Sequence, residues 1–122
     1  MDTKQIAQRL VDLCRAGKND EAHDTLYSSD IVSTEASSPP GMPAETKGME
    51  AIRRKGEWWV QNHEIHSATA KGPFTLGDRF AVLFQYDVTP KMGPGGGKRM
   101  QMEEVALYTV KDGKIVREEF MY

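Results

Sequence analysis

The sequence predicts an α+β domain in which helices come first and an antiparallel meander of strands follows. Three observations lead to this prediction. Apolar residues recur at three- and four-residue spacing near the beginning of the chain, alternating apolar runs fill its second half, and Asp112-Gly113 separates the last two runs. Asp-Gly is strongly favoured in two-residue hairpin turns. At 122 residues, the chain is expected to form one domain over residues 1–122.

Two helices are expected at the beginning. Residues 3–16 have apolar side chains at helical spacing, and Gly17 is placed to end this amphipathic helix. Asn19 or Asp20 can cap a second, shorter helix that ends near Tyr27.

A short strand, a loop and a third helix follow. The strand is expected over residues 31–35. Residues 37–47 read SSPPGMPAETK, and three prolines and a glycine favour a loop over a helix. This loop is long enough to act as a lid. Residues 48–61 are expected to form the third helix.

Four strands are expected over residues 63–71, 79–89, 99–110 and 115–122. The glycine-rich segment between the second and third of them reads as a hairpin loop, because it lacks the Lys-Ser pair and the following helix of a phosphate-binding loop. The strands therefore form a simple meander.

The Asp112-Gly113 turn predicts which residues of the last two strands face each other. A two-residue turn places Lys111 opposite Lys114, so Leu107 is expected opposite Glu118, Val105 opposite Phe120 and Glu103 opposite Tyr122. If Tyr86 pairs near Met102, the face that holds Glu103 and Glu118 also holds Leu83 and Asp87; we call it the Glu103 face. Glu104 and Glu119 fall on the other, more apolar face.

Composition limits the function. The net charge of −2 and the absence of a basic stripe argue against nucleic-acid binding. No apolar run approaches the roughly 18 residues that span a membrane, so a cytoplasmic location is expected. The single cysteine, Cys14, lies at helical spacing among leucines and is interpreted as a core residue.

Both faces of the expected sheet are largely apolar. A sheet with two apolar faces has to be covered on both. The three helices can cover one face, and we expect a second copy of the chain to cover the other as a homodimer through the outer sheet face.

At this point the chain resembles the nuclear transport factor 2-like superfamily, in particular its SnoaL-like and ketosteroid isomerase-like branch. The resemblance covers nearly the whole chain and rests on the order and spacing of AGKNDEAHDTLYSSDIVSTE, KGMEAIRRKGEWW and YTVKDGKIVREEF. It implies a cone-shaped, curved antiparallel sheet with three N-terminal helices, enclosing a pocket. It also implies that the Glu103 face lines that pocket.

The resemblance places Glu35, in the segment IVSTEAS, at the general-base position of ketosteroid isomerases. Their two oxyanion donors do not carry over, because Leu10 and Val105 occupy those positions. An enolate would lack its main electrostatic support, so typical ketosteroid isomerase activity is not expected.

Other members of the superfamily give further comparisons. The acid/base aspartate of SnoaL-type cyclases aligns with Phe120, and Glu118 is the nearest ionisable residue on the same face. The Asp-Arg-Asp cluster of epoxide hydrolase-like members has a weak counterpart in Asp87, Arg99 and Glu103. Glu103 and Glu118 remain open to two interpretations: solvated or paired carboxylates, or pocket acids with a raised pKa.

The residues expected to contact a ligand come from the third helix, its junction with the next strand, and the pocket face: Trp59, His63, His66, Leu83, Asp87, Val105, Phe120 and Tyr122. His63 and His66 lie three apart on an extended segment and should point to opposite faces, and no third ligand accompanies them. Neither a metal nor a cofactor is expected. One of the two histidines could act as a proton shuttle.

Three functions remain open. The first is a cofactor-independent isomerase, cyclase or lyase acting on a small hydrophobic ligand with a carbonyl group. Glu35 would be its base, and Glu103, Glu118 or a histidine its proton partner. The second is a module that binds such a ligand without catalysing a reaction. The absence of oxyanion donors at Leu10 and Val105 favours this second function. The third is an interaction protein that works through its dimer face.

Overall fold

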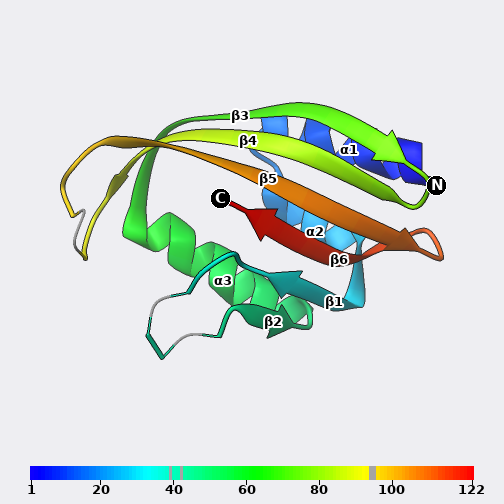
Figure 1. Cartoon of the computed structure of the whole chain (residues 1–122), viewed down its shortest axis with the longest axis horizontal. Coiled ribbons are helices and arrows are strands. Elements are labelled where there is room, and N and C mark those ends of the chain that lie inside the picture. Colours follow the sequence, from blue (N-terminus) through cyan, green and yellow to red (C-terminus); the bar gives the residue numbers. More distant parts are fainter. Residues whose placement is uncertain (39, 42, 94–95) are drawn as a thin grey trace.

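The computed structural model describes residues 1–38, 40–41, 43–93 and 96–122 (Figure 1). Its helices and strands, in chain order, are α1 (Thr3–Arg15), α2 (Asn19–Leu26), β1 (Tyr27–Thr34), β2 (Glu45–Lys47), α3 (Met49–Asn62), β3 (His63–Leu76), β4 (Arg79–Pro90), β5 (Met100–Lys111) and β6 (Lys114–Met121). The predicted α+β class is confirmed.

The helices begin and end for local reasons. Asp2 caps α1 in a capping box, in which its side chain accepts from the Gln5 amide and the Gln5 side chain accepts from the Asp2 amide. The prediction that Asn19 or Asp20 caps α2 is wrong, because Lys18 is the N-cap and no side chain caps it. Asp20 instead lies in the first turn, where its negative charge interacts favourably with the positive end of the helix dipole.

One curved six-stranded sheet, with the order β2-β1-β6-β5-β4-β3, forms the centre of the molecule. The sheet is mixed rather than antiparallel, because β1 pairs parallel with β6. It remains open, with β2 and β3 at its edges. Within the expected loop 37–47, residues 45–47 form the short strand β2, and Pro39 and Met42 lie outside the described residues.

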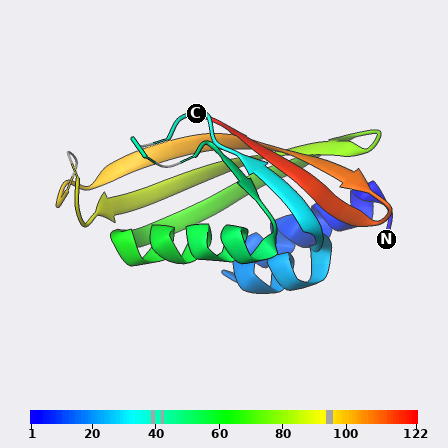
Figure 2. The ribbon, with the colours of Figure 1, turned by 90° about the horizontal axis from the view of Figure 1, so that it is seen from below.

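The three helices lie on one side of the sheet, and among the described residues no helix covers the opposite side (Figure 2). We call the helix-covered side the inner face and the opposite side the outer face. The core between helices and sheet contains Ile6, Leu10, Val11, Leu26, Ile31, Ile52, Phe80, Val82, Ala106, Tyr108 and Ile115. None of the described helices has the length and apolar character needed to cross a membrane.

The strand register confirms two predictions and corrects a third. Tyr86 pairs with Met102, as expected. Lys111 pairs with Lys114 across a turn in which Asp112 and Gly113 have φ values of 52° and 75°. An irregularity between Thr109 and Val110 then shifts the pairing by one residue.

Beyond this bulge the predicted pairs are wrong. Leu107 pairs with Glu119 instead of Glu118, and Val105 pairs with Met121 instead of Phe120. The same shift removes the expected pairing of Glu103 with Tyr122. A shift of one residue moves every later side chain of β6 to the other face.

Candidate functional site

Polar side chains from β1, the residue that follows it, α3, β5 and β6 meet beneath the inner face of the sheet. We call them the inner-face cluster; its members are Ser33, Glu35, Lys55, Glu104 and Glu118. The bulge in the β5–β6 hairpin brings Glu118 onto the same face as Tyr108. Glu104 lies on that face too, because every second residue of a strand points to the same side and Ala106 and Tyr108 follow it at that spacing.

Glu118 is the most deeply buried charged residue of the cluster, with 3% of its surface exposed. The Tyr27 hydroxyl donates a hydrogen bond to Glu118 Oε2 at 2.5 Å. A buried carboxyl group is costly unless it is hydrogen-bonded, and Tyr27 supplies that donor from the beginning of β1. Burial and the neighbouring Glu118 raise the pKa of Tyr27, so its hydroxyl keeps its proton.

Lys55 connects α3 to β1. Its Nζ donates to Ser33 Oγ at 2.7 Å and to Glu35 Oε1 at 3.0 Å. It also lies 5.3 Å from the centroid of the Phe120 ring, within the range of a cation–π contact. Only about a quarter of the Lys55 and Glu35 side-chain surfaces is exposed, at 27% and 26%. The ammonium group is therefore held in a fixed place beneath the sheet.

Glu104 is the carboxyl group of the cluster whose pKa lies close to neutral pH. Burial raises the pKa of Glu104 from 4.5 to about 7, and the charges of Glu35 and Glu118 add to that rise. Lys55 and a hydrogen bond with Tyr86 act in the opposite direction. At neutral pH this carboxyl group exists in both protonation states, which suits a group that gives and takes protons.

Aromatic residues line the α3 end of the same face. The Trp59 and His63 rings stack with centroids 3.7 Å apart, and His63 Nδ1 lies 2.9 Å from the Trp59 carbonyl oxygen. Trp59 also lies 6.2 Å from the ring of Tyr86. His66 is exposed and its Nε2 lies 2.7 Å from Thr89 Oγ1, so the two histidines have separate surroundings.

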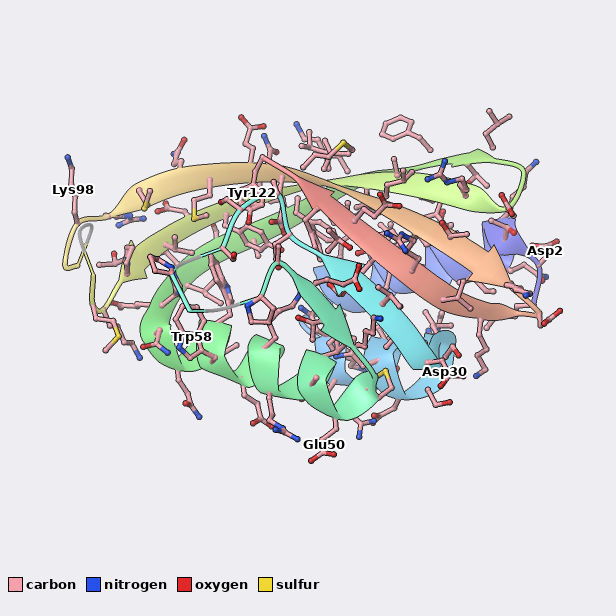
Figure 3. The ribbon with its side chains drawn as sticks, turned by 60° about the horizontal axis from the view of Figure 1, so that its bottom comes forward. Asp2, Asp30, Glu50, Trp58, Lys98 and Tyr122 are labelled. Carbon is pink, nitrogen blue, oxygen red and sulfur yellow. The ribbon has the colours of Figure 1, made fainter. Side chains whose placement is uncertain are left out.

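Tyr122 lies beside the linker that follows β1 (Figure 3). Its hydroxyl is 3.3 Å from Glu35 Oε2 and 3.0 Å from the Ser37 carbonyl oxygen. The Tyr122 side chain is 57% exposed. It therefore lies at the Glu35 side of the inner-face cluster, outside the core.

The structure separates ten of the eleven predicted site residues into two groups. The eleventh, His66, is exposed on the edge strand β3, where it contacts Thr89. Glu35, Glu118, Phe120, Tyr122, Trp59 and His63 lie at or near the inner-face cluster. Four others lie on the outer face, and their predicted place on the helix-covered side is wrong: Leu83, Asp87, Glu103 and Val105.

Their outer-face surroundings are simple. Arg99 binds Asp87 through two hydrogen bonds of 2.9 and 2.8 Å, which lowers the pKa of Asp87. Gln85 Nε2 donates to Glu103 at 3.1 Å. The described residues also form an open polar hollow of about 380 Å³ on this outer face, beside Ser67, Gln85 and Gln101.

The prediction missed four contributors to the cluster: Tyr27, Ser33, Lys55 and Glu104. The sequence places Glu104 on the more apolar face, which is the face expected to meet a second copy of the chain. Its face also holds Phe80, Val82 and Phe84, and that strongly apolar pattern was the available signal for the helix-covered side. Lys55 carries no such signal, because a lysine on an amphipathic helix usually faces solvent.

Within the described residues, no three histidine, cysteine, aspartate or glutamate side chains converge in a geometry that could hold a metal ion. The inner-face cluster combines three carboxyl groups with one ammonium group and the hydroxyl of Ser33, and the Tyr27 hydroxyl donates to one of those carboxyl groups. Such a set can transfer protons and stabilise a negative oxygen.

Comparison with known proteins identifies the family. The family model for the SnoaL-like domain matches residues 1–122. The chain belongs to the SnoaL-like family. This membership confirms the expected nuclear transport factor 2-like fold, and solved structures agree with it. No protein with a curated description matches significantly.

A crystal structure from Mesorhizobium loti is similar over 100% of both chains, with 43% identity and a TM-score of 0.92. That protein is provisionally named a SnoaL-like polyketide cyclase, with carbohydrate phosphatase as a bracketed term. A provisionally named polyketide cyclase from Pseudomonas putida has 16% identity and a TM-score of 0.70, over 100% of this chain and 92% of that one.

A protein from Catenulispora acidiphila with a ketosteroid isomerase-like fold, solved in complex with trimethylamine, has 19% identity and a TM-score of 0.71. The match covers 98% of this SnoaL-like chain and 86% of the other. At this identity the likeness concerns the fold alone.

Proposed function

We propose that this SnoaL-like protein binds a small apolar metabolite with a carbonyl group and moves a proton on it, as an isomerase, cyclase or lyase. The observation that carries the proposal is the position of Glu104, whose pKa of about 7 coincides with a place on the inner face beside Lys55 and Glu35. Carboxyl groups with such a raised pKa are concentrated at functional sites.

In this proposal each member of the cluster has a defined task. Glu104 exchanges a proton with the carbon next to the substrate carbonyl, or with its oxygen. The Lys55 ammonium stabilises the negative charge that develops on that oxygen, which replaces the donors absent at Leu10 and Val105. Ser33 and Glu35 hold Lys55 in place through bonds of 2.7 and 3.0 Å.

The substrate would enter past Tyr122. The structure shows this side chain 57% exposed and in contact with Glu35 and the linker, so its displacement opens the cluster without disturbing the core. Phe120 and Trp59 offer apolar surface for the rest of the molecule. The polyketide cyclase name of the Mesorhizobium loti structure supports a substrate rich in carbonyl groups.

A second candidate, binding without chemistry, is favoured by the surroundings of Glu35. Both of its oxygens have a partner, Lys55 at 3.0 Å and Tyr122 at 3.3 Å. A base that is satisfied in this way has to give up one partner before it can take a substrate proton. Glu35 therefore fits a positioning role better than the predicted role of general base.

Deuterium exchange at carbon tests the proposal. Cyclohexanone and β-tetralone, two apolar ketones, are incubated with the protein in D2O, and loss of the proton signal next to the carbonyl is followed by NMR. We expect the protein to accelerate exchange and Glu104→Gln to reduce that acceleration about 100-fold or more.

Glu103→Gln is the matched control, because Glu103 is adjacent in sequence and lies on the outer face. It should leave exchange unchanged. If β-tetralone shifts resonances of the inner-face cluster without accelerated exchange, the binding candidate replaces the acid/base one. Equal loss in both variants would contradict the assignment of Glu104.

A further inference from the structure

Tyr86, on β4, is the aromatic residue that connects Glu104 to helix α3. It pairs with Met102, and Phe84, two residues earlier on the same face, pairs with Glu104. Tyr86 and Glu104 are therefore diagonal neighbours across the β4–β5 pair. Such neighbours lie about 7–8 Å apart, a separation that aromatic and other long side chains can span. The strand register thus brings the Tyr86 hydroxyl within reach of the Glu104 carboxyl group.

The ring of Tyr86 is held by two aromatic neighbours. It lies nearly parallel to the Phe84 ring, with an angle of 12° between the planes and 6.2 Å between the centroids. The Trp59 ring of α3 lies 6.2 Å from it, at an angle of 55°. Trp59 is in turn stacked on His63. Aromatic pairs at these separations attract each other, so the Tyr86 hydroxyl has a defined direction.

The Tyr86 hydroxyl donates a hydrogen bond to Glu104. The other side chains described as acting on Glu104 do so through charge: Glu35 after β1, Glu118 on β6 and Lys55 on α3. Charges act over a distance, whereas a hydrogen bond also fixes the direction of the group that accepts it. Burial and then the charge of Glu104 raise the pKa of Tyr86, so its hydroxyl stays protonated and remains a donor.

We propose that Tyr86 is the positioning residue of Glu104: its hydroxyl holds one carboxyl oxygen and leaves the other free for the substrate. This inference rests on the proposed function, in which Glu104 exchanges a proton. A hydrogen bond donated to a carboxylate favours the ionised form. Tyr86 therefore opposes the effect of burial and keeps part of the Glu104 population able to accept a proton at neutral pH.

A structural role alone would not require the hydroxyl. Phe84 packs on the same face of β4 as an aromatic ring without a polar atom. A phenylalanine at position 86 could make the same ring contacts with Trp59 and Phe84. The hydroxyl is thus the part of Tyr86 that serves Glu104, and it can be removed without removing the ring.

The pKa of Glu104 in Tyr86→Phe tests the proposal directly. Carbon-13 NMR of the glutamate carboxyl carbons is followed over pH, and the Glu104 signal is the one lost in Glu104→Gln. Its pKa of about 7 should rise by roughly 0.5 to 1 in Tyr86→Phe, because a hydrogen bond to the charged form is lost. Tyr108→Phe is the matched control. Tyr108 lies on the same face as Glu104, which acts on it through charge alone, so this variant should leave the pKa unchanged.

Deuterium exchange of β-tetralone adds a kinetic measurement. The midpoint of the exchange rate against pH should rise in Tyr86→Phe together with the pKa of Glu104. Above the midpoint kcat should fall about tenfold with little change in KM, because Glu104 loses its orientation while the ring contacts remain. Circular dichroism shows that both variants fold.

Four outcomes are decisive. An unchanged pKa of Glu104 in Tyr86→Phe overturns the proposal, and so does an equal rise in Tyr108→Phe. A raised pKa with an unchanged kcat above the midpoint overturns the positioning role. If the wild type does not accelerate exchange, but the pKa rises in Tyr86→Phe alone, the proposed function fails and the hold of Tyr86 on Glu104 is supported.

Discussion

Glu104 shows how the pKa of a single carboxyl group depends on its neighbours. Its adjacent residue Glu103 points to the outer face and bonds an amide, whereas Glu104 lies under the sheet near two other carboxylates. Desolvation and these like charges both disfavour the ionised form of Glu104. The alternation of a strand thus produces two glutamates with different chemistry at consecutive positions.

The raised pKa of Glu104 makes a prediction for stability. Between pH 4.5, its usual value, and about 7, the folded protein binds more protons than the unfolded chain. The contribution of Glu104 to the free energy of unfolding therefore falls as pH rises through this range. Glu104→Gln removes that contribution, so the variant should lose less stability than the wild type on going from about pH 5 to about pH 8.

Urea unfolding at both pH values measures this difference, with Glu103→Gln as the control for removal of one negative charge. Glu103→Gln should keep the pH dependence of the wild type. An equal pH dependence in the wild type and in Glu104→Gln would show that Glu104 ionises as freely in the folded protein as in the unfolded chain.

At the scale of elements, the β5–β6 hairpin determines which carboxyl groups lie beneath the sheet. The sequence predicted its turn and first pair, because Asp-Gly at 112–113 is a strong local signal. The bulge lies between the Thr109–Arg117 and Val110–Ile115 pairs, with Val116 of β6 as the extra residue, and the local sequence has no comparable signal for it, since an extra residue is accommodated by the surrounding sheet. The prediction therefore placed Glu118 and Phe120 opposite the wrong residues of β5.

A pair of glycine substitutions tests how strongly the turn is fixed. Gly113 has a φ of 75°, where an alanine side chain is strained, so Gly113→Ala should lower the free energy of unfolding by about 1–2 kcal/mol. Gly56 lies within α3, and a Cβ there meets nothing within 4 Å. Gly56→Ala should raise stability by about 0.5–1 kcal/mol.

Denaturant unfolding of both variants measures the two effects. The same chemical change should act in opposite directions at the two sites. No effect of Gly113→Ala would contradict this account of the turn, and destabilisation by Gly56→Ala would contradict the open space described at that position of α3.

At the scale of the whole molecule, the sequence predicted the element order better than the sheet connections. Periodicity identifies helices and strands locally, but the parallel pairing of β1 with β6 joins residues from opposite ends of the chain. No local pattern in residues 27–34 indicates that partner. The same limit applies to Lys55, whose contacts with Ser33 and Glu35 depend on how α3 packs against β1.

The strand order predicts which parts of the molecule open most easily. β4 and β5 each have a strand on both sides, whereas β2 has three residues and lies at an edge. We expect amides in β4 and β5 to exchange hydrogen only on global unfolding, and those of β2 to exchange through local opening. Hydrogen exchange followed by mass spectrometry checks this order. Slower exchange in β2 than in β5 would contradict it.

The parallel pairing of β1 with β6 also has a consequence for biosynthesis. β1 is synthesised early, but its hydrogen-bonding partner lies more than 80 residues later, at Arg117–Glu119. Until the ribosome has made β6, one edge of β1 is left without its native neighbour. Contacts of such long sequence separation slow folding and expose strand edges meanwhile. Chaperones that shield nascent β1 would therefore raise the yield of folded protein.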